Sequence, residues 1–158
     1  MRIFEILIGL IIAVGFYNLI HHFLVIIPNR KRQLVVKNKI DQIVPKIMIS
    51  IRNDRLIPKR SNYVIMSKPL SKVWGRDIFA YEYVFNLDFH RQADLINFKH
   101  YFSNTLLSYC REHKITTKSG MGLYLVADIW KYQHRTHLDI ACIYNSATID
   151  YLKDIHRL

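Results

Sequence analysis

An apolar stretch near the start of the chain constrains the fold most. It runs from Ile6 to Ile27, reads ILIGLIIAVGFYNLIHHFLVII, and contains no Lys, Arg, Asp or Glu. About 20 such residues are enough to cross a bilayer as a helix. A chain of 158 residues is too short to bury a helix that is apolar on every side in its own core. The stretch therefore predicts a membrane anchor over residues 1–27.

The residues around this stretch predict its orientation. A cleaved signal peptide would have a shorter apolar run and a small-x-small cleavage site, and HHFLVIIPNRKR has neither feature. Arg2 and Glu5 precede the stretch, whereas several cations follow it closely, namely Arg30, Lys31, Arg32, Lys37 and Lys39. Because Lys and Arg remain on the cytoplasmic side of a bilayer, we expect a single-pass protein of the inner membrane with its C-terminal part in the cytoplasm.

Composition narrows the class of partner. The formal net charge is +11, which favours an anionic partner such as a nucleic acid, a phosphorylated small molecule or the acidic inner leaflet. The alternative is positive charge that serves only to orient the anchor. The chain has two cysteines and no CxxC pair, which suits a reducing compartment. Its many aromatic residues indicate a folded domain.

Residues 28–60 read as a basic helical connector. Apolar residues recur at helical spacing along one face of it, at Val36, Ile40, Ile43, Ile47 and Ile51. Pro28 and Asn29 should end the anchor, and Pro45 should kink or restart the connector helix. Two interpretations of the stripe remain open. It docks on the domain that follows, or it packs against copies of itself as an oligomeric bundle.

Residues 61–158 read as an α+β domain. Short strands are expected at residues 63–67 and 78–89, then a helix over residues 94–113 with Asp94 as its N-cap. A hairpin over residues 123–130 and 138–144 follows, and Ser146 should cap a last helix. The order ββαββα predicts a mainly antiparallel sheet with helices on one face, behind the N-terminal transmembrane helix.

No motif predicts catalysis, a cofactor or a metal. The sequence has no Walker A motif, no G-x-G-x-x-G and no G-x-S-x-G. His134 and His137 form an isolated H-x-x-H, which is a weak zinc signal without a third placed ligand. Glu112 and Lys114 have the spacing of some metal-dependent nucleases, but no second acidic residue is obviously placed beside them. We therefore expect a protein that is not an enzyme.

A binding role has more support. The loop after the long helix contains Lys118, Ser119, Gly120 and Gly122, whose backbone N–H groups can turn toward an anion. Cations and a ring suited to phosphates and to stacking bases lie near it in the predicted topology, namely Arg76, Lys114, Arg135 and Trp130. These residues form the predicted ligand-binding site. The alternative is an ordinary helix-to-strand connection, with the aromatics serving as sheet residues.

The anchor carries polar residues that are costly when they face lipid. Gly15, Asn18 and His22 recur at spacings of three and four, so they share one helical face. Several copies could turn this face inward, because glycine permits close helix approach. The sequence therefore predicts a homo-oligomer with a membrane bundle, or else a passive anchor that tolerates these residues.

The layout resembles one family, the small membrane effectors of type III CRISPR systems. The resemblance is carried by the anchor ILIGLIIAVGFYNLIHHFLVII, the NRKR flank and the basic aromatic domain, and it transfers no binding residue. It implies an oligomeric antiviral defence protein whose cytoplasmic domain binds a cyclic oligoadenylate. Two alternatives are a structural component of a conjugation or secretion complex in the membrane and a membrane-tethered protein that binds nucleic acid.

Overall fold

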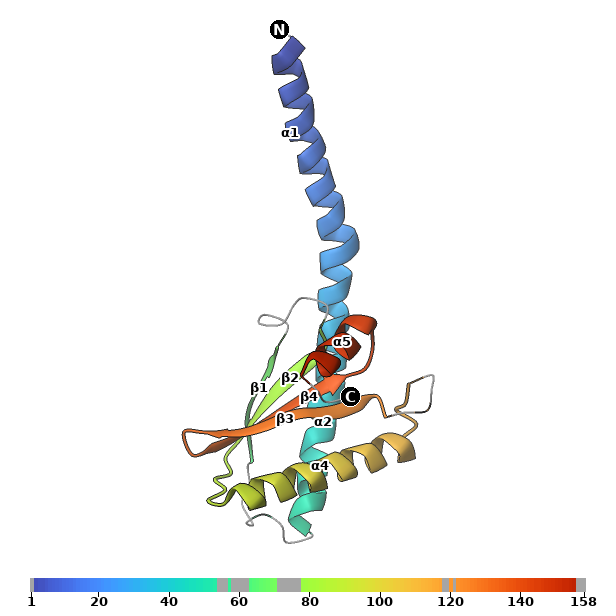
Figure 1. Ribbon diagram of the computed structural model, residues 1–158. Coiled ribbons are helices and arrows are strands. Elements are labelled where there is room, and N and C mark those ends of the chain that lie inside the picture. The colour runs from blue at the N-terminus through green and yellow to red at the C-terminus, as the bar shows by residue number, and fades with distance from the viewer. Residues whose placement is uncertain are drawn as a thin grey trace. The chain divides into compact units, whose positions relative to one another are not determined.

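The structure is a computed structural model that describes residues 2–53, 57, 63–70, 78–117, 120 and 122–155. It is an α+β chain with a long apolar N-terminal helix, a four-stranded antiparallel sheet and further helices (Figure 1). The chain divides into two compact units, Met1–Val35 and Val36–Leu158, here called the N-terminal unit and the C-terminal unit. The two are described separately below.

The N-terminal unit is helical throughout its described residues. Helix α1 covers Arg2–His21, a π-helical turn η1 covers His22–Ile26, and α2 begins at Ile27 and continues to Asn53. The unit includes the most apolar part of the 51-residue helix Ile3–Asn53, and the most apolar window of that helix is 0% buried. By length and composition, the helix is therefore able to cross a membrane.

Pro28 explains the π-helical turn. The Ile27 N–H bonds to the carbonyl of His22, five residues back, directly before Pro28. Proline has no N–H and crowds the carbonyl four residues before it, so a wider turn relieves the local conflict. The sequence predicted that the anchor ends at Pro28 and Asn29, and the helix itself continues through both residues. Proline is tolerated in the first turn of a helix, which is where Pro28 lies in α2.

In the C-terminal unit, α2 supplies one wall of the hydrophobic core. All five residues of the predicted stripe are buried, from Val36 to Ile51, and they pack in one cluster with residues of the sheet. The stripe therefore docks on the domain, as the first interpretation held. Helix α2 continues past Pro45, so the predicted restart does not occur.

The sheet has the strand order β1-β2-β4-β3, with all neighbouring strands antiparallel. The strands are β1 (Val64–Pro69), β2 (Ala80–Phe85), β3 (Tyr124–Tyr132) and β4 (Arg135–Cys142). Strand β2 is shorter than the predicted 78–89, because the backbone bends at Asn86. In β3, the register shifts between Val126 and Asp128, so the predicted alternation is interrupted by a bulge.

The helices cover both faces of the sheet. Side chains alternate along β2, so Tyr81, Tyr83 and Phe85 lie on one face, in the same core cluster as α2 and α4 (Gln92–Glu112). Ala80 belongs to a second cluster that contains Tyr151 and Leu152 of α5 (Ser146–Asp154). The prediction of helices on one face was therefore wrong for α5. Alanines on the second face leave room for a short helix.

Two predicted helix caps were also wrong by one to three residues. Arg91 is the N-cap of α4, and Asp94 lies in the first turn, where its carboxylate accepts hydrogen bonds from the Arg91 guanidinium at 2.7 and 2.9 Å. Asn145 caps α5, because its Oδ1 accepts a hydrogen bond from the Thr148 N–H at 3.0 Å. An Asn is as good an N-cap as a Ser.

Candidate functional site

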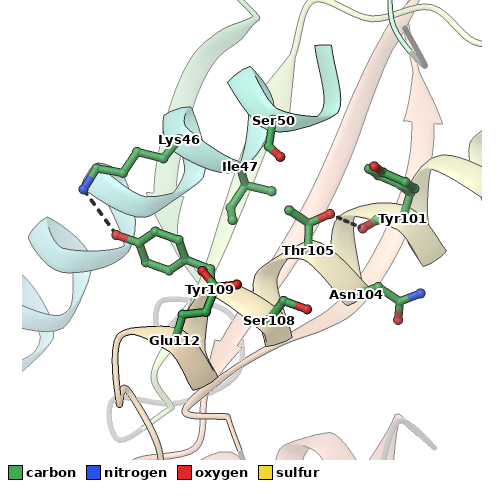
Figure 2. A pocket seen from close by; sticks show the side chains of 9 residues that line it. All are labelled: Lys46, Ile47, Ser50, Tyr101, Asn104, Thr105, Ser108, Tyr109 and Glu112. Atoms are coloured by element: carbon green, nitrogen blue, oxygen red, sulfur yellow. Dashed lines mark hydrogen bonds between the residues drawn. The ribbon is translucent and has the colours of Figure 1, made fainter. Parts of the chain in front are cut away.

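A groove between α2 and α4 is the candidate binding site of the C-terminal unit (Figure 2). It has a volume of about 400 Å³. Most of its lining side chains carry hydroxyl, amide or charged groups: Lys46, Ile47 and Ser50 come from α2, and Tyr101, Asn104, Thr105, Ser108, Tyr109 and Glu112 come from α4. We call it the α2–α4 groove.

The groove forms because the two helices present polar stripes beside their apolar ones. On α4, Tyr101, Thr105, Ser108 and Glu112 follow one another at spacings of four, three and four. These residues therefore lie on one side of the helix, next to the buried stripe that contains Phe102. On α2, Lys46 and Ser50 are exposed and stand four residues apart, beside the buried Ile47.

Lys46 supplies the positive charge of the groove and is held in place by Tyr109. Its Nζ donates a hydrogen bond to the Tyr109 hydroxyl at 3.2 Å and lies 5.7 Å from the centroid of the same ring. The His113 ring stacks on Tyr109 with a centroid distance of 3.9 Å. A lysine ammonium has three donors, so Lys46 keeps further donors for a ligand. The Tyr109 hydroxyl accepts from Lys46 and can still donate its own proton.

The rest of the groove supplies hydroxyl and amide groups. The Thr105 hydroxyl donates to the Tyr101 carbonyl at 2.9 Å, which fixes its orientation within α4. In Figure 2, Ser50 of α2 and Ser108 and Asn104 of α4 also line the hollow, and Glu112 lies one turn beyond Tyr109. Hydroxyls and the amide can bind phosphate or sugar oxygens, and the Glu112 carboxylate can accept from ligand hydroxyl or amino groups. The lining therefore offers both donors and acceptors to a small polar ligand.

The predicted loop site is described only in part. Lys118, Ser119 and Arg76 lie outside the described residues. Gly120 has a φ of +82°, and its N–H bonds to the Thr117 carbonyl at 3.0 Å, so it belongs to a tight turn that favours glycine. Gly122 is buried, and a Cβ there would come within 3.0 Å of Leu107 Cδ2. Close approach of the chain to α4 therefore explains why this residue is a glycine.

The structure separates the other predicted ligand residues. Lys114 lies in the same loop as Gly120 and Gly122, before β3 begins. Trp130 lies toward the opposite end of β3, and Arg135 of β4 pairs with Tyr132 at that end, so both are roughly 25–30 Å from Gly122 at about 3.3 Å per residue. Trp130 stacks on His137 at a centroid distance of 5.3 Å, and Arg135 is exposed opposite Tyr132. The predicted ligand residues therefore lie in two separate groups and do not form one site.

The three predicted residues of the membrane bundle are exposed on the helix surface. A Cβ at Gly15 would meet nothing within 4 Å, and Asn18 and His22 are exposed. His22 is also the first residue of the π-helical turn. Helical spacing places Gly15 and Asn18 on one side of α1. Because both are exposed, this side is free to contact lipid or another helix.

Within the described ranges, the histidines and cysteines are not arranged for metal binding or for a reactive thiol. No group of three or more His, Cys, Asp or Glu there is arranged to hold a metal ion. His134 bonds to Asp88 at 2.8 Å and His137 to Glu82 at 2.7 Å, so the two histidines have separate partners. Both cysteines are buried, and burial, followed by the nearby Cys110, raises the pKa of Cys142 to about 12. This thiol is protonated at neutral pH and is a poor nucleophile.

The chain was compared with protein-family models, with curated proteins and with solved structures. None of them matches. The assignment of a function therefore depends on the residues of the chain itself.

The α2–α4 groove was not predicted from the sequence. Lys46 and Ser50 were assigned to the connector, and Glu112 was considered only for its spacing from Lys114. A signal was present in the polar stripe from Tyr101 to Glu112, because polar residues at helical spacing next to a core stripe mark the border of a buried interface. Such a stripe more often marks a solvated face. Only the packing of α2 on α4 shows that Lys46 lies beside it.

Proposed function

We propose that the chain is a single-pass membrane protein whose C-terminal unit binds an anionic nucleotide in the α2–α4 groove. One observation carries this proposal: Lys46, fixed by Tyr109, lies in a groove of about 400 Å³ that is lined with hydroxyl groups. Sites for small ligands have volumes of about 300–1,000 Å³ and a few convergent polar groups. Hydrogen bonds from a charged donor to a phosphate are about twice as strong as neutral ones.

Net charge supports the same class of ligand. A chain with a formal charge of +11 attracts anions from solution and raises their rate of encounter with the protein. Glu112 gives the groove one acceptor beside its donors, which suits a ligand with a phosphate at one end and hydroxyl or amino groups at the other. A nucleotide has this distribution of groups. The proposal assigns binding and no catalysis.

The membrane part of the proposal is based on the helix of the N-terminal unit. This helix is long and apolar enough to span a bilayer, and the cations from Arg30 to Arg32 favour a cytoplasmic location for the C-terminal unit. A C-terminal alkaline phosphatase fusion should then be inactive and a C-terminal fluorescent fusion bright. An active phosphatase fusion would favour the alternative of a conjugation or secretion component, which works outside the cytoplasm.

The resemblance in layout to membrane effectors of type III CRISPR systems extends the proposal. On this view, the nucleotide is a cyclic oligoadenylate, the protein is a homo-oligomer, and ligand binding acts on the membrane segment. Helical residues run without a break from Ile3 to Asn53, so the helix that lines the groove is continuous in the chain with the apolar segment. A ligand that bridges α2 and α4 would therefore contact the same helix.

A thermal-shift panel on the full-length protein in lipid nanodiscs tests this function. The ligands are cyclic oligoadenylates of several ring sizes and AMP, with single-stranded RNA, single-stranded DNA, inorganic phosphate and uncharged adenosine as comparisons. At 100 times its dissociation constant, a specific ligand stabilises the folded state by about 2.7 kcal/mol. For a chain of this size, this corresponds to a rise in melting temperature of roughly 5–10 °C.

The panel also separates the alternatives. A rise with a nucleotide and none with adenosine supports the proposal. A rise only with single-stranded RNA or DNA, steeply reduced by salt, would favour a membrane-tethered nucleic-acid-binding protein. The absence of any rise across the panel would contradict the proposal and favour a structural component of a membrane complex.

A further inference from the structure

A row of four charged residues crosses the whole sheet on the face that carries α5. The strand register pairs Lys68 of β1 with Glu82 of β2, Glu82 with Asp139 of β4, and Asp139 with Asp128 of β3. Directly paired residues on neighbouring strands have Cβ atoms about 4.5–5.5 Å apart. Two carboxyl groups, those of Glu82 and Asp139, therefore lie side by side in the middle of the sheet. We call these four residues the polar row.

The two central carboxyl groups are equally buried but differ in their contacts. Glu82 and Asp139 are each 6% exposed. The Lys68 Nζ lies 3.0 Å from Glu82 Oε2, and the His137 Nδ1 lies 2.7 Å from Glu82 Oε1, so both oxygens of Glu82 have a partner. Asp139 Oδ1 is also buried, and no group in the described part of the chain bonds to it.

This difference predicts which of the two carboxyl groups keeps a proton. A buried carboxylate without a partner is costly, and a second negative charge nearby adds to the cost. Burial, followed by the charges of Glu82 and Asp128, raises the pKa of Asp139 to about 8, with only a partial opposing effect from Lys68. Asp139 is therefore mostly uncharged at pH 7.

Helix α5 packs directly beside this carboxyl group. Tyr151 and Leu152 of α5 form a cluster with Leu70, Ile143 and three alanines of the sheet, Ala80, Ala127 and Ala141. Tyr151 is close enough to Asp139 and Asp128 for both to raise the pKa of its hydroxyl, although burial is the main cause. The titratable groups that surround Asp139 are thus Lys68, Glu82, Asp128, His137 and Tyr151.

Helix α5 is short and is held by one small apolar cluster and one anchoring residue. The helix has nine residues. Apart from the alanine cluster, Thr148 anchors it, because the Thr148 hydroxyl accepts a hydrogen bond from the Phe79 N–H at 3.0 Å and donates one to Asn145 Oδ1 at 2.7 Å. Alanine side chains offer little apolar area to bury. A helix this short is also marginal without tertiary packing.

We propose that Asp139 is a proton-binding site that keeps α5 packed on the sheet and loosens it when the proton is lost at alkaline pH. Loss of the proton places a charge beside Glu82, and Lys68 is already bound to Glu82. Water must then reach Asp139, and because α5 packs beside this carboxyl group, displacement of α5 would admit it. This device is independent of the α2–α4 groove, which lies on the opposite face of the sheet.

Hydrogen exchange of the full-length protein in nanodiscs tests the proposal. Exchange is followed by mass spectrometry from pH 6 to pH 9.5 and corrected for the intrinsic dependence of exchange on pH. We expect the protection of α5 amides to fall about tenfold between pH 7 and pH 9, since the ionised fraction of a group with a pKa of about 8 rises from about 0.1 to about 0.9 over this range. The protection of α4 should not change. Asp139→Asn should keep α5 protected at every pH.

Asp88→Asn is the control, because it neutralises a carboxylate that, unlike Asp139, is bonded to a lysine and a histidine, Lys131 and His134, and that lies on the hairpin side of the molecule. This variant should lose α5 protection as the wild type does. Constant protection of α5 in the wild type, or the same loss in Asp139→Asn, would overturn the proposal. If Asp139→Asn does not fold, carbon NMR of the wild-type Asp139 carboxyl decides: a group that is ionised at pH 7 also overturns it.

Discussion

Helix α1 and the apolar stripe of α2 are similar in residue type and opposite in environment. In α1, Leu10 is 63% exposed and Phe16 is 62% exposed, whereas Ile40 and Ile47 of α2 are 0% and 1% exposed. The α2 stripe is one-sided, and Ile49 on the other side of that helix is 51% exposed. A one-sided stripe finds its partner within the chain. A helix that is apolar on all sides needs a different apolar medium, which under the proposed function is lipid.

The largest effect should follow from deleting residues 2–27. Without this segment, no helix in the described residues is apolar and long enough to span a bilayer, so we expect the protein to move almost entirely from the membrane fraction to the soluble fraction. The melting temperature of the C-terminal unit should stay unchanged, because its core begins at Val36. Cell fractionation and circular dichroism measure both. If the deletion protein remains in the membrane fraction, the claim that α1 is the segment that needs lipid is wrong.

The next effect separates the two sides of α2. Ile47→Ala should lower the free energy of unfolding by about 2–5 kcal/mol, because it removes a buried side chain and leaves a cavity. Ile49→Ala, two residues away on the exposed side, should change it by no more than about 0.5 kcal/mol. Urea unfolding followed by tryptophan fluorescence compares the two variants. Equal losses would mean that α2 is not docked by its stripe.

A smaller effect concerns the polar contacts that join α2 to the sheet. The Tyr83 hydroxyl donates to Asp41 Oδ1 at 2.6 Å, and Lys37 bonds to the other oxygen at 2.5 Å. Burial acts to raise the pKa of Asp41, but hydrogen bonds from Lys37, Tyr83 and Ser67 together lower it. Tyr83→Phe should therefore cost about 1 kcal/mol at pH 7, a value that allows for the partial exposure of Asp41.

The pH dependence of this contact has a definite sign. Because the pKa of Asp41 is lower in the folded state, its stabilisation is present above the ordinary value of 3.8 and is lost as the pH falls below it. Tyr83→Phe should therefore destabilise less at pH 3 than at pH 7. A loss that is the same at both pH values would show that Asp41 takes no part.

The smallest effect concerns the exposed face of α1. Asn18→Leu with His22→Leu should weaken self-association by roughly 1 kcal/mol, which is typical for polar contacts between membrane helices. Sedimentation in detergent micelles measures the oligomer, and Leu19→Ala on a different side of the helix serves as the control. An unchanged oligomer would indicate that α1 is a passive anchor.

The same contrast explains how much of the fold could be predicted. The stripe from Val36 to Ile51 repeats with the period of a helix, and Tyr81, Tyr83 and Phe85 repeat with the period of a strand. Each repeat predicts both the element and the face that it buries. The α5 face lacks such a pattern. Its alanines carry little hydrophobic signal, and Glu82 and Asp139 read as solvent-facing residues although both are buried. Only the register of β2 against β4 brings the two together.

The candidate site could not be predicted for a related reason. The predicted site combined cations and glycines from different parts of the chain. Strand β3 runs between Gly122 and Trp130 and keeps them far apart. Lys46 and Ser108 are far apart in sequence and meet only because α2 and α4 share one face of the sheet. The polar stripe of α4 marks one wall of the groove, but nothing in the local sequence pairs it with Lys46.

The central claim is that an anionic nucleotide binds in the α2–α4 groove, and a paired titration tests it most directly. Calorimetry would measure the affinity of full-length protein in nanodiscs for the nucleotide that gives the largest thermal shift. Lys46→Ala should weaken binding about 10- to 100-fold, because a hydrogen bond from a charged donor contributes about 1.5–3 kcal/mol. Lys39→Ala removes an exposed cation of the same helix outside the groove, and it should weaken binding less than about threefold. Equal losses in the two variants, or no loss in Lys46→Ala, would contradict the claim.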